Sequence, residues 1–149
     1  MTARRIVVIG SGPAAFAAVR SYRDAGGDGA LAIVGAEPHL PYERPPLTKA
    51  FLRGESDRDE LVLEPSSWYR EHAVDLRLGS RAERIDPARG EVVLDNGQSM
   101  PADACLLATG ARPLRPPLPE LAMTTCSRCA SWTTASDSLH APQRPIAPS

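Results

Sequence analysis

A short glycine-containing segment near the N-terminus constrains the fold of this chain more than any other feature. The apolar run RRIVVIG (4–10) leads into GSGPAA (10–15), and an alanine-rich segment with helical spacing follows. A buried strand, a tight glycine turn and a helix in this order begin a βαβ unit with a parallel sheet. Gly10 permits the tight turn, Gly12 lets a pyrophosphate approach the backbone, and Ala15 keeps the helix close to the strand. The segment therefore predicts a binding site for the phosphates of a dinucleotide.

Two further features extend this predicted site. Pro13 and Ala14 open the helix, whose first turn offers free N–H groups and a partial positive charge to the phosphates. The run ALAIVGAE (30–37) predicts a second buried strand that ends at Glu37, where a carboxylate can accept hydrogen bonds from an adenosine ribose. The alternative interpretation is a tight turn between strand and helix, followed by an ordinary acid at a strand end.

The chain divides into two unlike parts near residue 112. All 11 glycines precede this point. Residues 113–149 contain no glycine, and they contain seven of the 15 prolines. We expect an α/β fold over 1–112 with a Rossmann-like βαβ unit, and an irregular tail over 113–149. Further elements are predicted in the first part: strands at 61–63, 74–79 and 103–110, helices at 47–54 and after Ser66 or Ser67, and a hairpin over 91–100 that turns at Asn96-Gly97.

Charge and hydrophobicity exclude several classes of protein. The net charge of −1 gives no reason to expect nucleic acid or an anionic membrane as a partner. No apolar stretch approaches the ~20 residues of a membrane helix, and the first apolar run is too short for a signal peptide. We therefore expect a cytoplasmic protein.

The three cysteines do not form an evident site. Cys126 and Cys129 have CxxC spacing, which can mean a redox dithiol or half of a zinc site. Their flanks predict no helix that would lower a thiol pKa, His140 is the one histidine downstream, and the three histidines share no ligand spacing. We expect no metal site, and we interpret Cys105 as a small apolar residue in a buried strand.

Four segments together resemble a known family. IVVIGSGPAA, IVGAE, PYERPPLTKAFL and LLATGARP are similar to the N-terminal FAD-binding segment of the ferredoxin reductase group. These flavoproteins are related to putidaredoxin and rubredoxin reductases, within the pyridine nucleotide-disulfide oxidoreductase superfamily. The resemblance covers residues 4 to about 114, and PYxRPPLTK is its most specific part. It implies an FAD-dependent NAD(P)H oxidoreductase that passes electrons to a ferredoxin or a similar iron–sulfur carrier.

The resemblance also implies roles for individual residues. Lys49 is the one lysine among 17 basic residues, and an ordinary surface lysine is the alternative interpretation. By resemblance it lies near the isoalloxazine ring as the catalytic residue, where an ammonium stabilises the negative charge of the reduced ring. Arg44 adds positive charge on the flavin side. The backbone at Ala82 matches an adenine contact, and Thr109 and Gly110 match a turn that closes over the cofactor.

Features that the chain lacks refine the expected function. Residues 38–60 contain no cysteine, unlike disulfide reductases of the superfamily, so electrons are expected to pass to an external acceptor. No glycine follows Gly110, so the family's second glycine-rich loop for NAD(P)H is expected to be absent, and the chain alone to be inactive. By resemblance, the chain is expected to be roughly the first third of an enzyme, with residues 1–112 as the N-terminal part of a three-layer FAD-binding domain that is incomplete. The alternative is a non-catalytic dinucleotide-binding remnant.

The tail allows two interpretations. With GC-rich codons, RCASWTT (128–134) read one base earlier gives Leu-Arg-Glu-Leu-Asp-Asp, close to a stretch that the family has after ATGARP. This suggests a frameshift between about Leu121 and Cys126. The alternative is a genuine disordered tail rich in proline, serine and threonine.

Overall fold

The chain forms two compact units. The structure is a computed structural model that describes residues 4–111 and Ser131. The first unit comprises Met1–Glu43 and Val62–Gly110, and the second comprises Arg44–Leu61 and Ala111–Ser149. The predicted boundary near residue 112 therefore remains a prediction, as do the interpretations of the tail and of the CxxC pair, which lie outside the described residues.

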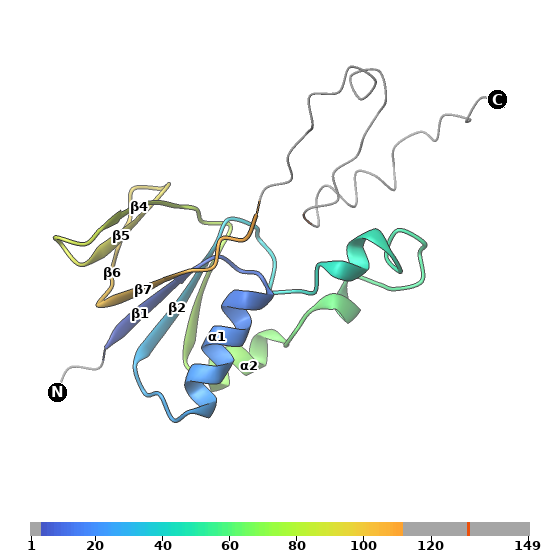
Figure 1. The fold of residues 1–149 in the computed structure, drawn as a ribbon, viewed down its shortest axis with the longest axis horizontal. Coiled ribbons are helices and arrows are strands. Elements are labelled where there is room, and N and C mark those ends of the chain that lie inside the picture. Colours follow the sequence, from blue (N-terminus) through green and yellow to red (C-terminus); the bar gives the residue numbers. More distant parts are fainter. Residues whose placement is uncertain (1–3, 112–130, 132–149) are drawn as a thin grey trace, which may run out of the picture. The chain divides into compact units, whose positions relative to one another are not determined.

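The first unit is built on a four-stranded parallel sheet with the strand order β3-β2-β1-β7 (Figure 1). Each neighbouring pair in this sheet is parallel. The two central strands are the most buried, as their continuous apolar runs predicted. The predicted Rossmann-like parallel sheet is thus confirmed, with the strands β1 (Arg5–Ile9), β2 (Ala30–Gly35), β3 (Val74–Leu78) and β7 (Ala104–Leu107).

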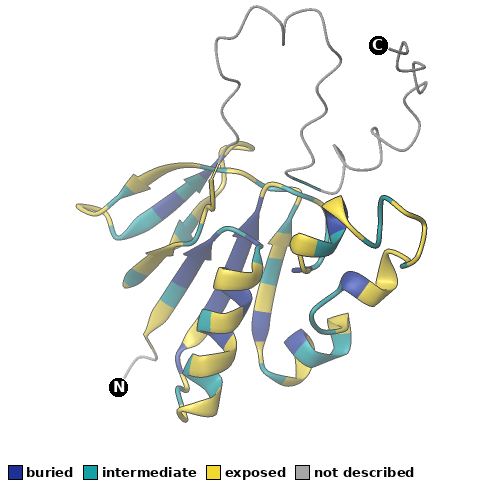
Figure 2. Cartoon of the chain, turned by 45° about the vertical axis from the view of Figure 1, so that its right-hand side comes forward, coloured by how far each residue is buried: buried dark blue, intermediate teal, exposed yellow. Residues whose placement is uncertain are grey.

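Two layers cover this sheet, one on each face. Helices α1 (Pro13–Asp24) and α2 (Ser66–Glu71) pack on one face. An antiparallel sheet with the order β4-β5-β6 packs on the other face. Its strands are β4 (Ala82–Asp86), β5 (Glu91–Leu94) and β6 (Ser99–Pro101). Figure 2 shows the buried central strands behind the exposed outer face of α1.

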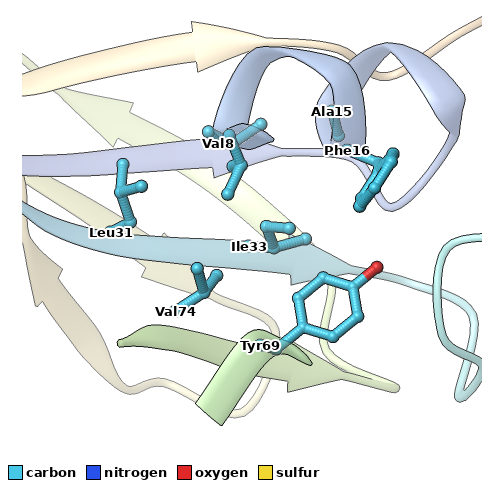
Figure 3. Packing of buried hydrophobic residues seen from close by; sticks show 8 residues of the cluster. Val8, Ala15, Phe16, Leu31, Ile33, Tyr69 and Val74 are labelled. Atoms are coloured by element: carbon cyan, nitrogen blue, oxygen red, sulfur yellow. The ribbon is translucent and has the colours of Figure 1, made fainter. Parts of the chain in front are cut away.

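Alternate residues of the parallel sheet form two separate cores, because successive side chains of a strand point to opposite faces. The core on the helical side is drawn in Figure 3 and consists of Val8, Ala15, Phe16, Val19, Leu31, Ile33, Tyr69 and Val74. The core beneath the antiparallel sheet consists of Val7, Ile9, Ala32, Val34, Val92 and Leu94.

A fork of hydrogen bonds ties the start of β1 to the turn before β7. Arg5 donates from Nη2 to Asp103 Oδ1 at 2.8 Å and from Nε to Oδ2 at 3.1 Å. The backbone N–H of Arg5 also donates to Asp103 Oδ2 at 2.8 Å. These hydrogen bonds hold the pKa of Asp103 down to about 2.

Several local predictions are confirmed and others are wrong. The hairpin turn at Asn96-Gly97 is present, with Gly97 at φ +81°. The predicted serine cap is wrong, because Pro65 is the N-cap of α2 and Ser66 is already helical. The predicted strand 61–63 is reduced to one isolated bridge between Tyr42 and Val62.

Strand β7 is mostly exposed, so the prediction that it is buried is wrong. It forms the end of the four-stranded sheet, and within the described residues only β1 pairs with it. Leu106 is 41% exposed and Leu107 is 65% exposed. Cys105 is exposed as well, so its interpretation as a core residue is wrong. An apolar run predicts a strand, but it cannot say whether a neighbour covers that strand.

The described part of the second unit contains two 3₁₀ helices, η1 (Pro45–Thr48) and η2 (Asp59–Leu61). The helix predicted over 47–54 is therefore wrong in type and in extent, because η1 overlaps it only at Leu47 and Thr48 and residues 49–54 form turns. The tight geometry begins at the prolines, which have no N–H, and the Lys49 N–H donates to the Pro46 carbonyl at 2.9 Å. Gly54 lies at φ +70°.

No helix within residues 4–111 has both the length and the apolar character needed to cross a membrane. In the same part of the chain, no three His, Cys, Asp or Glu side chains gather in a way that could hold a metal ion.

Tyr69 carries a polar group that the helical-side core does not satisfy. Its ring lies against Phe16 with 6.2 Å between ring centroids (Figure 3). Its hydroxyl oxygen is buried, and it has no hydrogen-bond partner among the residues described. Burial, and secondarily the charge of Glu64, raises the pKa of Tyr69.

Removing this hydroxyl should stabilise the protein. We expect Tyr69→Phe to raise the free energy of unfolding by about 1 kcal/mol, because a buried unsatisfied hydroxyl costs about 1–3 kcal/mol. Urea denaturation would measure the change. Tyr22→Phe is the matched control with the opposite sign, since the Tyr22 hydroxyl accepts a hydrogen bond from Gly29 N–H at 3.1 Å. A loss of stability in both variants would contradict the expectation.

Candidate functional site

The predicted phosphate loop lies where three parallel strands end. It connects Ile9, the last residue of β1, to Pro13, the first residue of α1. Gly10 N–H donates to the Val34 carbonyl at 2.8 Å, and Ala108 N–H donates to the Ile9 carbonyl at 2.8 Å. The loop is therefore fixed at the carboxyl ends of β2, β1 and β7, which is the edge where open α/β sheets bind ligands.

Gly10 cannot be replaced by a residue with a side chain at this position. Its φ of +118° is a conformation that L residues rarely adopt. A Cβ atom there would overlap the Ala108 carbonyl oxygen and lie 3.2 Å from the Thr109 nitrogen. The tight turn predicted for Gly10 is thus present, and the ATG segment packs directly against it.

Gly35 and Ser11 form a second close contact, which the sequence reasoning missed. A Cβ atom on Gly35 would lie 2.5 Å from both Cβ and Oγ of Ser11. Ser11 is 8% exposed, and it is buried against the last residue of β2. A glycine that ends a buried strand was the available signal, since such glycines often mark a close approach of backbones.

The start of α1 is suited to an anion. Gly12 is the N-cap in an extended conformation, with φ −91° and ψ −178°, and Phe16 N–H donates to its carbonyl at 3.1 Å. Pro13 occupies the first turn, and this turn contains no acidic side chain. Ala14 is exposed, whereas Ala15 is completely buried in the core. Ala15 packs in the core between α1 and the sheet, as predicted. The approach of a pyrophosphate to Gly12 stays a prediction, and it is supported by the attraction of phosphate to the first N–H groups of a helix.

Glu37 lies two residues beyond the end of β2, and not on the strand as predicted. Its backbone is fixed, because Gly79 N–H donates to the Glu37 carbonyl at 3.1 Å and Ser80 N–H donates to the Gly35 carbonyl at 2.9 Å. Its carboxylate is also held, since Tyr42 Oη donates to Oε2 at 2.6 Å. Sequence spacing identified Glu37 but gave no signal for its contact with Tyr42.

The remaining predicted residues fall in both units. Ala82 opens β4 shortly after the Ser80 contact and packs on the core beneath the antiparallel sheet. Thr109 and Gly110 follow β7, with Thr109 exposed and Gly110 at φ +71°. Arg44 and Lys49 belong to the second unit, where Arg44 is half-buried and Lys49 is exposed at the end of η1. The first unit thus collects every other predicted residue at or near one edge of the sheet.

Comparison with known proteins identifies relatives of this chain. Rhodocoxin reductase of Rhodococcus erythropolis is 42% identical over 114 residues, which cover 76% of this chain and 27% of that protein. The ferredoxin–NAD(+) reductase subunit of the benzene 1,2-dioxygenase system of Pseudomonas putida is 34% identical over 110 residues, covering 74% of this chain and 27% of that protein. The chain therefore spans about a quarter of the length of the curated relatives it matches.

A solved structure and a family profile are also similar to this chain. The crystal structure of the covalent putidaredoxin reductase–putidaredoxin complex matches with a TM-score of 0.74 and 30% identity, covering 78% of this chain and 28% of the matched chain. The profile of the family described as "Pyridine nucleotide-disulphide oxidoreductase" matches residues 4–145. Since this match extends over most of the sequence, the chain belongs to the pyridine nucleotide-disulphide oxidoreductase family.

Proposed function

We propose that this chain holds the FAD of an NAD(P)H-dependent oxidoreductase that passes electrons to a ferredoxin-type iron–sulfur carrier. The observation that carries the proposal is the glycine loop, where Gly10 fits only without a side chain between the ends of β1 and β7. The names of the relatives, which are ferredoxin reductase components, support the electron acceptor. No part of the proposal depends on a metal.

The residues at the carboxyl edge of the sheet fit such a cofactor. The first turn of α1 would hold the pyrophosphate, with Gly12 and Ala14 presenting backbone to it. Glu37 would accept a hydrogen bond from the adenosine ribose, and the backbone near Ala82 would border the adenine. Thr109 and Gly110 would close the turn beside Gly10. When bound, FAD supplies the capacity to accept a hydride and release single electrons.

Lys49 and Arg44 complete the proposed set. Both carry positive charge on the proline-rich segment, and Lys49 is exposed beside the rigid turn of η1. A fixed ammonium favours the anionic, reduced state of a flavin, because it stabilises charge that develops during the reaction. The proposal for Lys49 rests on this residue type and on the loop sequence.

The test is FAD binding by the 149-residue chain. We expect the parent chain to bind FAD, and Gly12→Val to weaken binding by about 100-fold or more, because a β-branched side chain occupies the phosphate space. Flavin fluorescence titration would measure both dissociation constants. Gly26→Ala, beyond the opposite end of α1 from the glycine loop, serves as the control and should leave binding unchanged, because a Cβ atom there meets no other atom within 4 Å. Equal FAD affinity in the Gly12→Val variant and the parent would overturn the assignment.

A second candidate is a dinucleotide-binding protein without catalysis. It needs only the loop between β1 and α1 and gives no role to Lys49. Steady reduction of a ferredoxin by NADH or NADPH in the presence of the FAD-loaded chain would support the enzyme. Binding of FAD without any such turnover would support the second candidate.

A further inference from the structure

Tyr42 makes a short hydrogen bond to Glu37, one of the predicted site residues. Its Oη donates to Glu37 Oε2 at 2.6 Å, a length typical of a strong hydrogen bond to a charged carboxylate. The side chain is only 4% exposed. The contact therefore joins a buried phenol to the first carboxylate after β2.

The backbone around Tyr42 is fixed independently of Glu37. Tyr42 forms an isolated antiparallel bridge with Val62, and Leu63 N–H donates to the Pro41 carbonyl at 3.0 Å. Pro41 is completely buried. The phenol ring thus has a defined position within the first unit, and it acts as a rigid anchor for any group bonded to it.

The position of Glu37 in the chain does not by itself fix the conformation of its side chain, so a bonded neighbour is needed to orient the carboxylate. It lies beyond the strand, where backbone hydrogen bonds fix the main chain but leave the side-chain torsions open. A carboxylate has two oxygens and about four acceptor sites, so the tyrosine bond leaves capacity for other donors. One oxygen bound to Tyr42 sets the direction in which the carboxylate faces.

We propose that Tyr42 is a positioning residue that aims the Glu37 carboxylate at the ribose 2′-hydroxyl of an adenine nucleotide. This inference rests on the proposed function, and it names the ligand class of that site, which is nucleotides with an unsubstituted ribose diol. Pre-organisation lowers the ordering cost of binding, so the tyrosine hydroxyl strengthens a ribose contact that it does not itself make. A purely structural tyrosine would have no influence on which sugar is bound.

The experiment compares two probes on the 149-residue chain, ADP and 2′-deoxy-ADP, by isothermal titration or NMR. We expect the parent to prefer ADP by roughly tenfold, as for a hydrogen bond to a charged group. In Tyr42→Phe, which keeps the ring and removes the hydroxyl, the preference should fall to about threefold or less. In Glu37→Ala the preference should disappear, and adding Tyr42→Phe to that variant should change nothing further.

Controls separate the possible failures. Tyr22→Phe removes another hydrogen-bonded tyrosine hydroxyl, the one that accepts from Gly29, and should keep the parent's preference for ADP. If Tyr42→Phe weakens both nucleotides equally, or leaves the ratio unchanged, Tyr42 has only a structural role and the inference is wrong. If the parent binds FAD but shows no preference for ADP over 2′-deoxy-ADP, this inference is wrong and the proposed function stands. If the parent binds neither FAD nor ADP, the proposed function fails as well.

Discussion

Gly10→Ala is expected to lower the free energy of unfolding by about 3 kcal/mol or more. Two costs add at this position. The φ of +118° strains any residue with a side chain, which costs roughly 1–3 kcal/mol. The new methyl group also overlaps the Ala108 carbonyl oxygen, and overpacking of this kind costs a further 1–3 kcal/mol. Because the obstacle is backbone that pairs β7 with β1, no side-chain rotation can relieve it.

Gly97→Ala separates the two costs. Gly97 also has a positive φ, +81°, but a Cβ atom there would meet no other atom within 4 Å. It should therefore show only the backbone strain, about 1–2 kcal/mol. Urea denaturation followed by circular dichroism would compare the two variants. Losses of equal size would mean that the contact between Gly10 and Ala108 does not matter for stability.

Arg23→Met is expected to cost about 2–4 kcal/mol of stability. The guanidinium of Arg23 donates to four backbone carbonyls, and a hydrogen bond to a charged group contributes about 1.5–3 kcal/mol. Two of these carbonyls lie in the loop before β2 and two lie in the turn before β3. One side chain therefore holds the chain segments that lead into both strands. The acceptors and distances are Gly27 at 2.7 Å, His72 at 2.8 Å, Gly29 at 2.9 Å and Ala73 at 3.2 Å.

Arg20→Met is the matched control, on the same helix and with the same change in charge. The Arg20 side chain is 52% exposed and forms ion pairs with Asp24 at 3.9 Å and Glu64 at 3.4 Å. Its guanidinium also lies 5.9 Å from the centroid of the Phe16 ring. Exposed pairs of this kind contribute about 0–1 kcal/mol. If Arg20→Met were as destabilising as Arg23→Met, loss of helix charge would explain both results, and the carbonyl contacts would not be needed.

The sequence predicted those features that a local pattern determines. The run before Gly10 and the alternation around Asn96-Gly97 specify a strand, a loop and a hairpin through neighbouring residues alone. In contrast, the burial of β7 depends on what covers Leu107, and the direction of the Glu37 carboxylate depends on Tyr42, which reaches it across a loop. Contacts of this kind leave no periodic signal in the chain.

Other wrong or missing predictions have local causes that a pattern of hydrophobicity does not include. The segment after Arg44 has helical spacing, yet two consecutive prolines without N–H groups favour a 3₁₀ turn. Strand β4 went unpredicted because Ile85 is the one large apolar residue in AERID, and most of its side chains are exposed. The close approach of Gly35 to Ser11 joins two segments whose separate patterns were correctly interpreted.

The fork between Arg5 and Asp103 links folding to proton uptake. An unpaired aspartate takes up its proton near pH 3.9, whereas the folded chain holds the pKa of Asp103 down to about 2. Between these values the unfolded chain binds more protons, so the contribution of the fork is complete above the upper value and disappears as pH falls through the lower one. The junction between β1 and the turn into β7 therefore keeps its full contribution only down to the pH at which ordinary exposed carboxylates take up protons, although Asp103 itself stays charged below that pH.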